Sequence, residues 1–162
     1  MNKKLISLFT ALALIAVSLF SVYLAFANDV TWSYDSETNT LYISGTGAMT
    51  SYSSADEVPW KNYISSVKTV VIEDAVSSLG DYAFYGASKI NKLTMPLSLK
   101  ASENTTVWYG CSNIKTLRLT YGTGYMDDYA DDSVTYYRNS PWYISRKAIT
   151  SFSLDENVLY VG

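Results

Sequence analysis

Apolar residues recur along this chain in a fixed order. Each copy has an apolar residue, two variable positions, a second apolar residue, one variable position and a third apolar residue. The copies are Val67–Ile72, Ile90–Met95, Ile114–Leu119 and Ile149–Leu154, and their starts lie 23, 24 and 35 positions apart. Alternating apolar positions are typical of a strand with one buried face. A unit of this length buries its apolar face only against a neighbouring unit, so the spacing predicts a solenoid of stacked coils.

The apolar order is also the strand signature of a leucine-rich repeat. In such solenoids, function usually lies on the surface that the stacked strands present. The repeat pattern therefore predicts a binding protein rather than an enzyme.

Aromatic residues recur just before the repeated segments. Phe84 and Trp108 each lie six positions before the first apolar residue of the next copy. Trp60 and Trp142 each follow a proline on the approach to Val67 and Ile149. We expect these rings to fill the core where each coil bends, because large rings bury large areas. Ligand stacking is the alternative.

Two β-prone segments precede the repeats. Thr31–Tyr34 and Thr40–Ser44 are separated by the polar stretch Asp35–Asn39, which predicts a β-hairpin. Gly45 and Gly47 are expected to end its second strand. A solenoid exposes an apolar end unless something covers it, so we interpret residues 28–58 as an N-terminal cap.

The opposite end has no such cap in the sequence. Phe152 and Leu154 are followed by Asn157–Gly162, where the chain stops within what resembles another coil. Two interpretations remain open: the chain is a fragment of a longer array, or its last coil associates with another molecule.

Residues 1–27 have the chemistry of an export signal. Lys3 and Lys4 form a positive head, residues 5–27 carry no charge, and Ala25 and Ala27 provide small residues for cleavage. The uncharged run is also long enough to span a bilayer, so an uncleaved anchor is the alternative. Either way we expect the rest of the chain to be secreted or on the cell surface, with residues 59–162 forming the repeats. Contact with a membrane is expected only through residues 1–27, if they stay uncleaved.

Charge, cysteine and histidine content narrow the function. Without Lys3 and Lys4 the chain carries 10 basic and 15 acidic side chains and no basic cluster, so we expect no nucleic-acid partner. The single cysteine, Cys111, excludes an internal disulfide and occupies the position of Ala87 in the preceding coil, which indicates a small buried residue. The chain has no histidine, which excludes histidine-dependent catalysis and histidine metal sites.

Several short stretches give the chain a family resemblance. Leu41–Met49, Pro59-Trp60, Ile72–Asp74 and Asp81–Gly86 resemble the BspA-like leucine-rich repeat family of bacterial exported proteins. The resemblance implies a right-handed, mostly β solenoid of α/β repeat type, with parallel strands, short helical turns and the N-terminal hairpin cap. It also implies attachment to host proteins, glycans or other cells. Leu97–Glu103 departs from the family pattern, and residues 121–140 form an insertion.

One candidate site is the exposed face of the strands. Residues between the apolar positions are expected to point out of the sheet in rows, forming a polar, weakly basic strip suited to a glycan or an extended polypeptide. The alternative is a solvated sheet face. The rows are Val71, Thr94, Arg118 and Ser153; Thr69, Lys92, Thr116 and Ser151; and, at the edge, Lys68, Asn91, Lys115 and Thr150.

The inserted segment is the second candidate site. Tyrosine offers broad contact area and a hydroxyl group, which suits binding loops. A lengthened loop without function is the alternative. Four nearby aspartates are a weak calcium candidate, because their spacing fits no EF-hand loop. The tyrosines are Tyr121, Tyr125, Tyr129, Tyr136 and Tyr137, and the aspartates are Asp127, Asp128, Asp131 and Asp132.

The hypothesis that follows is an exported protein that binds an extracellular protein or glycan, including one from a host, and needs no cofactor. A structural subunit that self-assembles through open solenoid ends is the first alternative. A carboxylate-dependent hydrolase is a remote one, since two acids at a suitable separation would suffice.

Overall fold

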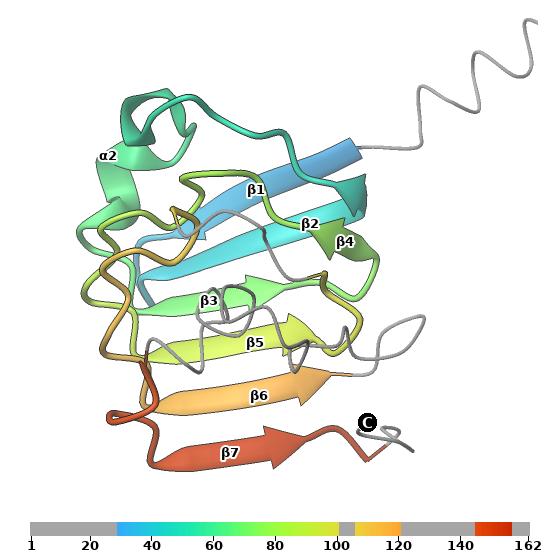
Figure 1. The fold of residues 1–162 in the computed structure, drawn as a ribbon, viewed down its shortest axis with the longest axis vertical. Coiled ribbons are helices and arrows are strands. Elements are labelled where there is room, and N and C mark those ends of the chain that lie inside the picture. Colours follow the sequence, from blue (N-terminus) through green and yellow to red (C-terminus); the bar gives the residue numbers. More distant parts are fainter. Residues whose placement is uncertain (1–28, 101–105, 121–144, 157–162) are drawn as a thin grey trace, which may run out of the picture.

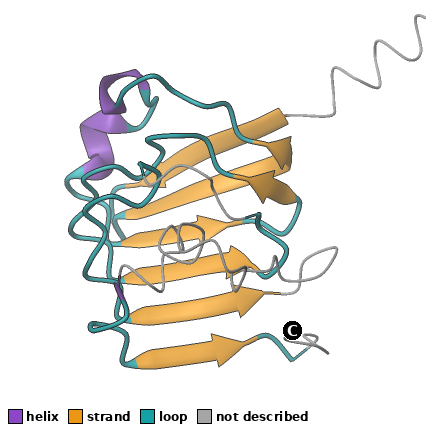
Figure 2. Ribbon diagram, in the orientation of Figure 1, coloured by secondary structure: helices purple, strands orange, loops and turns teal. Residues whose placement is uncertain are grey.

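The repeated segments form strands that stack one below another (Figure 1). The computed structural model describes residues 29–100, 106–120 and 145–156. The named helical elements in this part are two short pieces, Ser145 is also helical, and loops connect the strands (Figure 2). The elements are β1 (Asp29–Asp35), β2 (Thr40–Ala48), η1 (Ala55–Glu57), α2 (Lys61–Ile64), β3 (Thr69–Ile72), β4 (Val76–Ser78), β5 (Lys92–Pro96), β6 (Thr116–Thr120) and β7 (Ser151–Leu154).

The main sheet has the order β1-β2-β3-β5-β6-β7. Every neighbouring pair from β2 to β7 is parallel, and only β1 pairs antiparallel, with β2. Parallel neighbours that follow one another in sequence need a connection across the other side of the coil. The predicted solenoid of parallel strands is therefore confirmed, and β2 forms its first rung.

The hairpin at the N-terminal end is present, but its second strand is longer than expected. β2 continues through Gly45 and Gly47 to Ala48, so the expectation that these glycines end the strand is wrong. Both have positive φ, 100° and 90°, which bends the strand without ending it. Beyond the bend, Gly47 and Ala48 pair in parallel with β4, a short strand that the sequence pattern did not indicate.

A ladder of shared carbonyl groups aligns the beginnings of the coils. The carbonyl of Asn39 accepts hydrogen bonds from the backbone N–H groups of Lys68 and Thr69, at 2.9 and 3.3 Å. The carbonyls of Lys68, Asn91 and Lys115 each accept two such bonds from the next coil in the same way. One carbonyl thus binds the first two amides of each following coil, which holds the strands in register.

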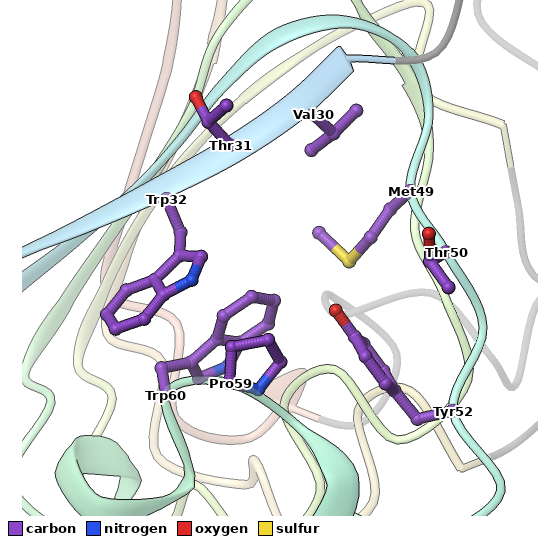
Figure 3. A pocket seen from close by; sticks show the side chains of 8 residues that line it. All are labelled: Val30, Thr31, Trp32, Met49, Thr50, Tyr52, Pro59 and Trp60. Atoms are coloured by element: carbon purple, nitrogen blue, oxygen red, sulfur yellow. The ribbon is translucent and has the colours of Figure 1, made fainter.

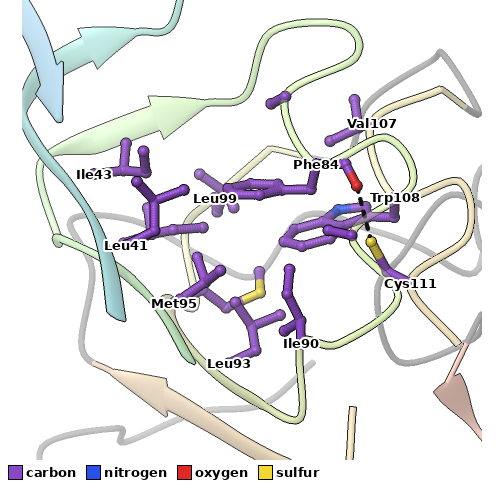
Figure 4. Close-up of a cluster of buried hydrophobic side chains, with 14 of the residues drawn as sticks. Leu41, Ile43, Phe84, Ile90, Leu93, Met95, Leu99, Val107, Trp108 and Cys111 are labelled. Carbon is purple, nitrogen blue, oxygen red and sulfur yellow. Dashed lines mark hydrogen bonds between the residues drawn. The ribbon is translucent and has the colours of Figure 1, made fainter. Parts of the chain in front are cut away.

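A column of aromatic rings fills the core on the loop side. Phe84 stacks on Trp108 with centroids 4.6 Å apart, and Trp60 lies 6.3 Å from Phe84 at a tilt. All three rings are buried, as predicted, and the Trp60 indole N–H donates to the carbonyl of Ala83 at 2.8 Å. Buried aliphatic side chains of the strands, including Leu41, Ile43 and Leu93, complete this core (Figure 4).

Cys111 is fully buried beside this column, as predicted. Its thiol donates to the carbonyl of Phe84 at 3.1 Å, drawn as a dashed line in Figure 4. Burial raises the pKa of the Cys111 thiol to about 12. The side chain is therefore an uncharged packing group at neutral pH.

The segment that departs from the family pattern still contributes to the core. Leu97 and Leu99 are buried, and Lys100 forms an isolated parallel bridge with Ser78, next to the pairing of β4 with β2. The helical turns expected from the resemblance occur before β3 as η1 and α2. In the described residues no helix is long and apolar enough to cross a membrane. The predicted signal segment, residues 1–27, lies outside the described ranges, and the boundaries of the cap and the repeats stay predictions.

Candidate functional site

The predicted strand rows lie in register on one face of the sheet. Thr69, Lys92, Thr116 and Ser151 are successive pairing partners, as are Val71, Thr94, Arg118 and Ser153. Adjacent strands are about 4.8 Å apart, so each row is a nearly straight file of side chains. The second apolar residue of each copy lies between the two rows and points to the opposite face, where those of β3, β5 and β6 are buried. The structure thus brings together the strand residues that the sequence selected, while their role in binding stays a prediction.

Both rows continue onto the hairpin, which the sequence pattern indicated only as a cap. Tyr42 pairs with Val71 and with Ser33, and Tyr42 is exposed. Thr40 pairs with Thr69 and with Asp35. The alternation of apolar and polar residues in Thr40–Ser44 could have revealed this extension, because Tyr42 lies between the buried positions Leu41 and Ile43.

The turn at the end of the hairpin is closed by a carboxylate. Asp35 Oδ2 accepts a hydrogen bond from the Thr38 hydroxyl at 2.7 Å, and Oδ1 accepts one from the Glu37 N–H at 2.8 Å. These bonds, that of Thr38 first, lower the pKa of Asp35. The row that begins with Asp35 therefore runs from an anionic turn to the lysine-bearing coils.

Charge is divided between the two parts of the described molecule. In residues 29–66 one lysine, Lys61, accompanies five acids: Asp29, Asp35, Glu37, Asp56 and Glu57. In the described residues from 67 onward the balance is reversed. The basic side chains there are Lys68, Lys89, Lys92, Lys100, Lys115, Arg118, Arg146 and Lys147, and the acids are Glu73, Asp74, Asp81, Asp155 and Glu156.

The basic side chains concentrate where the strands begin, and acids occur where they end. Lys68 and Lys115 directly precede β3 and β6, and Lys92 begins β5. Glu73 and Asp155 directly follow β3 and β7. Arg118 forms an ion pair with Asp155, with Nη2 and Oδ2 3.1 Å apart. The strand face therefore carries exposed cations along one edge, whereas Arg118 is paired with an acid of the neighbouring coil.

A pair of exposed tyrosines on the loop side was not singled out from the sequence. The rings of Tyr85 and Tyr109 stack with centroids 4.9 Å apart and an angle of 14°. Each follows a core aromatic, Phe84 or Trp108, and precedes a glycine of positive φ, Gly86 or Gly110. The Tyr-Gly step that recurs after each core aromatic could have indicated this tyrosine pair from the sequence.

The second predicted site lies outside the described residues. This applies to the five tyrosines and four aspartates of the insertion, and to Trp142. Within residues 29–100, 106–120 and 145–156, no group of three or more His, Cys, Asp or Glu side chains is arranged to hold a metal ion.

Comparison with known proteins identifies the repeats. The model of the BspA type leucine-rich repeat region, with six copies, matches residues 61–162. A comparison with curated proteins gives no match. Among solved structures, a leucine-rich repeat protein from Eubacterium ventriosum aligns with a TM-score of 0.43 at 17% identity, over 83% of this chain and 40% of that one. Because the family model covers more than half of its residues, the chain belongs to the BspA-type leucine-rich repeat family.

Proposed function

We propose that this chain is an exported binding protein that attaches to an extracellular protein or glycan through the exposed face of its parallel strands. The single observation that carries the proposal is the register of the two rows across β3, β5, β6 and β7. Solenoids use such extended sheet faces for binding, because each added coil lengthens the same surface.

The chemistry of the rows favours an anionic or hydroxyl-rich partner. The hydroxyl groups of Thr69, Thr94 and Thr116 both donate and accept hydrogen bonds, so they suit a glycan or a peptide backbone. Lys92 is exposed in the middle strand, and Lys68 and Lys115 are exposed on either side of it at the edge. These amines add attraction for carboxylate or sulfate groups, which would weaken as salt is added.

The experiment compares lysines on and off this face. Lys92→Glu combined with Lys115→Glu is expected to weaken capture of the partner, found on an array of glycans and matrix proteins, by about tenfold or more. Lys100→Glu is the matched control, because Lys100 is exposed but lies on the second parallel ladder, beside Ser78. Equal loss in both variants, or no loss in either, would refute the strand face as the site.

The tyrosine-rich insertion is tested in parallel. Replacing Tyr125, Tyr129, Tyr136 and Tyr137 with serine leaves the strand face intact. Capture that survives the lysine changes but is lost with the tyrosines would move the site to the insertion, with circular dichroism confirming that both variants remain folded.

A second candidate function is self-assembly, and exposure of the last strand favours it. Phe152 and Leu154 occupy apolar rows that are buried in the preceding coils, yet they are 56% and 40% exposed. Under this proposal β7 is a surface onto which another copy stacks. Light scattering over a concentration series is expected to show mass rising with concentration, and Phe152→Asp to abolish the rise. A constant monomer mass for the unmodified chain would exclude this function.

A further inference from the structure

A hollow with a volume of about 370 Å³ lies at the N-terminal end of the solenoid, between β1 and the segment that follows β2. It is separate from the strand face, since its aromatic side chains belong to the loop side of the molecule. Volumes of this size are at the lower end of those that hold small ligands. Its lining residues are Val30, Thr31, Trp32, Met49, Thr50, Tyr52, Pro59 and Trp60 (Figure 3).

Three aromatic rings line the hollow. Trp32 lies 5.9 Å from Trp60 at an angle of 62°, and Tyr52 lies 6.1 Å from Trp60 at 87°. Rings at such steep angles enclose a compact group from several sides, whereas a flat sugar ring stacks best on a single open face. The walls therefore suit a rounded ligand.

The rings differ in what they offer a ligand. Trp60 is buried and its indole N–H is bonded to the Ala83 carbonyl, so it closes the bottom of the hollow without an unpaired polar group. Trp32 is 37% exposed, so a ligand can reach it from solvent. Burial raises the pKa of Tyr52 above its ordinary value of 10, so its hydroxyl stays neutral at physiological pH. The hollow is thus aromatic, uncharged in its lining and open on one side.

The lining has few hydrogen-bond acceptors, which determines the kind of cation that can bind. None of the eight lining residues carries a charge or a carboxamide group. A primary ammonium or guanidinium group that enters the hollow loses its hydrogen bonds to water. Its N–H groups then need several acceptors in the protein. A quaternary ammonium group has no N–H to satisfy, and it is attracted by the faces of tryptophan and tyrosine rings.

The surroundings are anionic, which complements a cationic ligand. Asp29 adjoins Val30 in the sequence, and Asp56 and Glu57 lie shortly before Pro59. Glu57 Oε2 accepts a hydrogen bond from the Ser53 N–H at 2.9 Å, which places this carboxylate beside the segment that carries Tyr52. The nearest cation in sequence, Lys61, donates to the Asp56 carbonyl. A field of this sign raises the local concentration of small cations.

We propose that this hollow binds a quaternary ammonium group, such as the trimethylammonium of choline. The proposal is independent of the strand face, and it includes choline carried by a lipid or a polymer as well as free choline. Trp32 and Tyr52 are the walls a ligand meets, and Trp60 is the floor.

The test titrates the full chain with choline chloride and follows tryptophan fluorescence at constant ionic strength. Binding is expected to saturate, and 3,3-dimethylbutan-1-ol, the uncharged isostere of choline, to bind at least about tenfold more weakly. Trp32→Ala is expected to weaken choline binding by about tenfold. Tyr109→Ala, which removes an exposed ring on another part of the surface, should leave binding unchanged.

A second variant keeps the test valid if Trp32→Ala does not fold. Thr50→Arg adds a cation at the exposed rim and removes no wall, so it should abolish choline binding while circular dichroism stays unchanged. Sedimentation with phosphatidylcholine vesicles against phosphatidylglycerol vesicles separates a membrane headgroup from free choline as the source. The proposal is overturned if choline does not saturate, if the neutral isostere binds equally well, or if methyl glucoside displaces choline.

Discussion

The two ends of the described solenoid carry the same apolar rows but bury them differently. Leu41 in β2 and Phe152 in β7 belong to one row, and Ile43 and Leu154 belong to the next. The two residues of β2 are fully buried, whereas Phe152 and Leu154 are 56% and 40% exposed. An apolar pattern thus designates the face that points inward, and a covering neighbour is needed to remove it from water.

Aromatic side chains cover the N-terminal end of the solenoid core. Tyr34 of β1 stacks on Tyr63 of α2 with centroids 4.6 Å apart, and Trp32 lies 6.2 Å from the same ring. Among the described residues this end also carries mostly acids, while basic side chains outnumber acids in the described coils from residue 67 onward. The cap therefore closes the core and creates a hollow of different chemistry from the strand face.

The largest difference in the free energy of unfolding is expected between two alanine substitutions in the same apolar row, one in β6 and one in β7. Leu117→Ala removes a side chain buried between β5 and β7 and should lower the free energy of unfolding by about 2 to 5 kcal/mol. Phe152→Ala at the same row in β7 should cost about 1 kcal/mol or less, because the ring is already largely in water. Denaturant unfolding measures both, and equal losses would show that β7 is covered.

The bend in β2 is tested by replacing Gly45 with alanine and comparing the result with the same change at Gly86. Gly45→Ala should destabilise the protein by at least about 2 kcal/mol, because φ is 100° and the new Cβ would lie 1.8 Å from the Asp29 carbonyl oxygen. Gly86→Ala, with φ of 75° but no atom within 4 Å, should cost only about 1 kcal/mol. Thermal unfolding distinguishes the two, and a tolerated Gly45→Ala would contradict the close contact of β1 with the bend.

Removal of a buried hydroxyl group near the last coil should cause the next largest loss of stability. Ser145 Oγ donates to the Cys111 carbonyl at 2.6 Å and accepts from the Ile114 N–H at 3.3 Å. Ser145→Ala leaves both backbone groups without this partner and should cost about 1 to 3 kcal/mol. The exposed Ser112→Ala is the control. Matching stabilities would mean that the last coil is not joined to β6 through this side chain.

Cys111 reports whether the coils between the two ends exclude water. Its pKa is raised by burial from 9.0 to about 12, so the folded state holds the thiol proton more tightly than the unfolded state. The stabilisation is complete below pH 9 and is lost between pH 9 and 12, by up to about 1.4 kcal/mol per pH unit. Cys111→Ala places at this position the residue found at Ala87 in the preceding coil. It should remove this contribution to the pH dependence of the free energy of unfolding. Rapid alkylation of the native thiol at pH 8 would contradict the burial.

The repeat, the hairpin and the aromatic column were predictable because each leaves a local pattern. Phe84 and Trp108 recur at one position of the coil, and the apolar triplets recur at another. The extension of β2 to Ala48 was not predictable, because a glycine of positive φ reads as a strand end when its later partner, Val76, is unknown. The strand rows and the outward direction of Tyr42 followed from alternation, but the alignment of Tyr42 with Val71 depended on the parallel pairing of β2 with β3.

The sequence by itself determined which residues face inward along each coil, since the alternation of a strand and the length of a repeat are encoded locally. Only the tertiary structure decided which of those residues are buried, because burial depends on the neighbouring coil and β7 exposes a row that β6 hides. It also decided the aromatic hollow, because Trp32 belongs to the hairpin and meets Tyr52 and Trp60 of the later segment only when the chain folds.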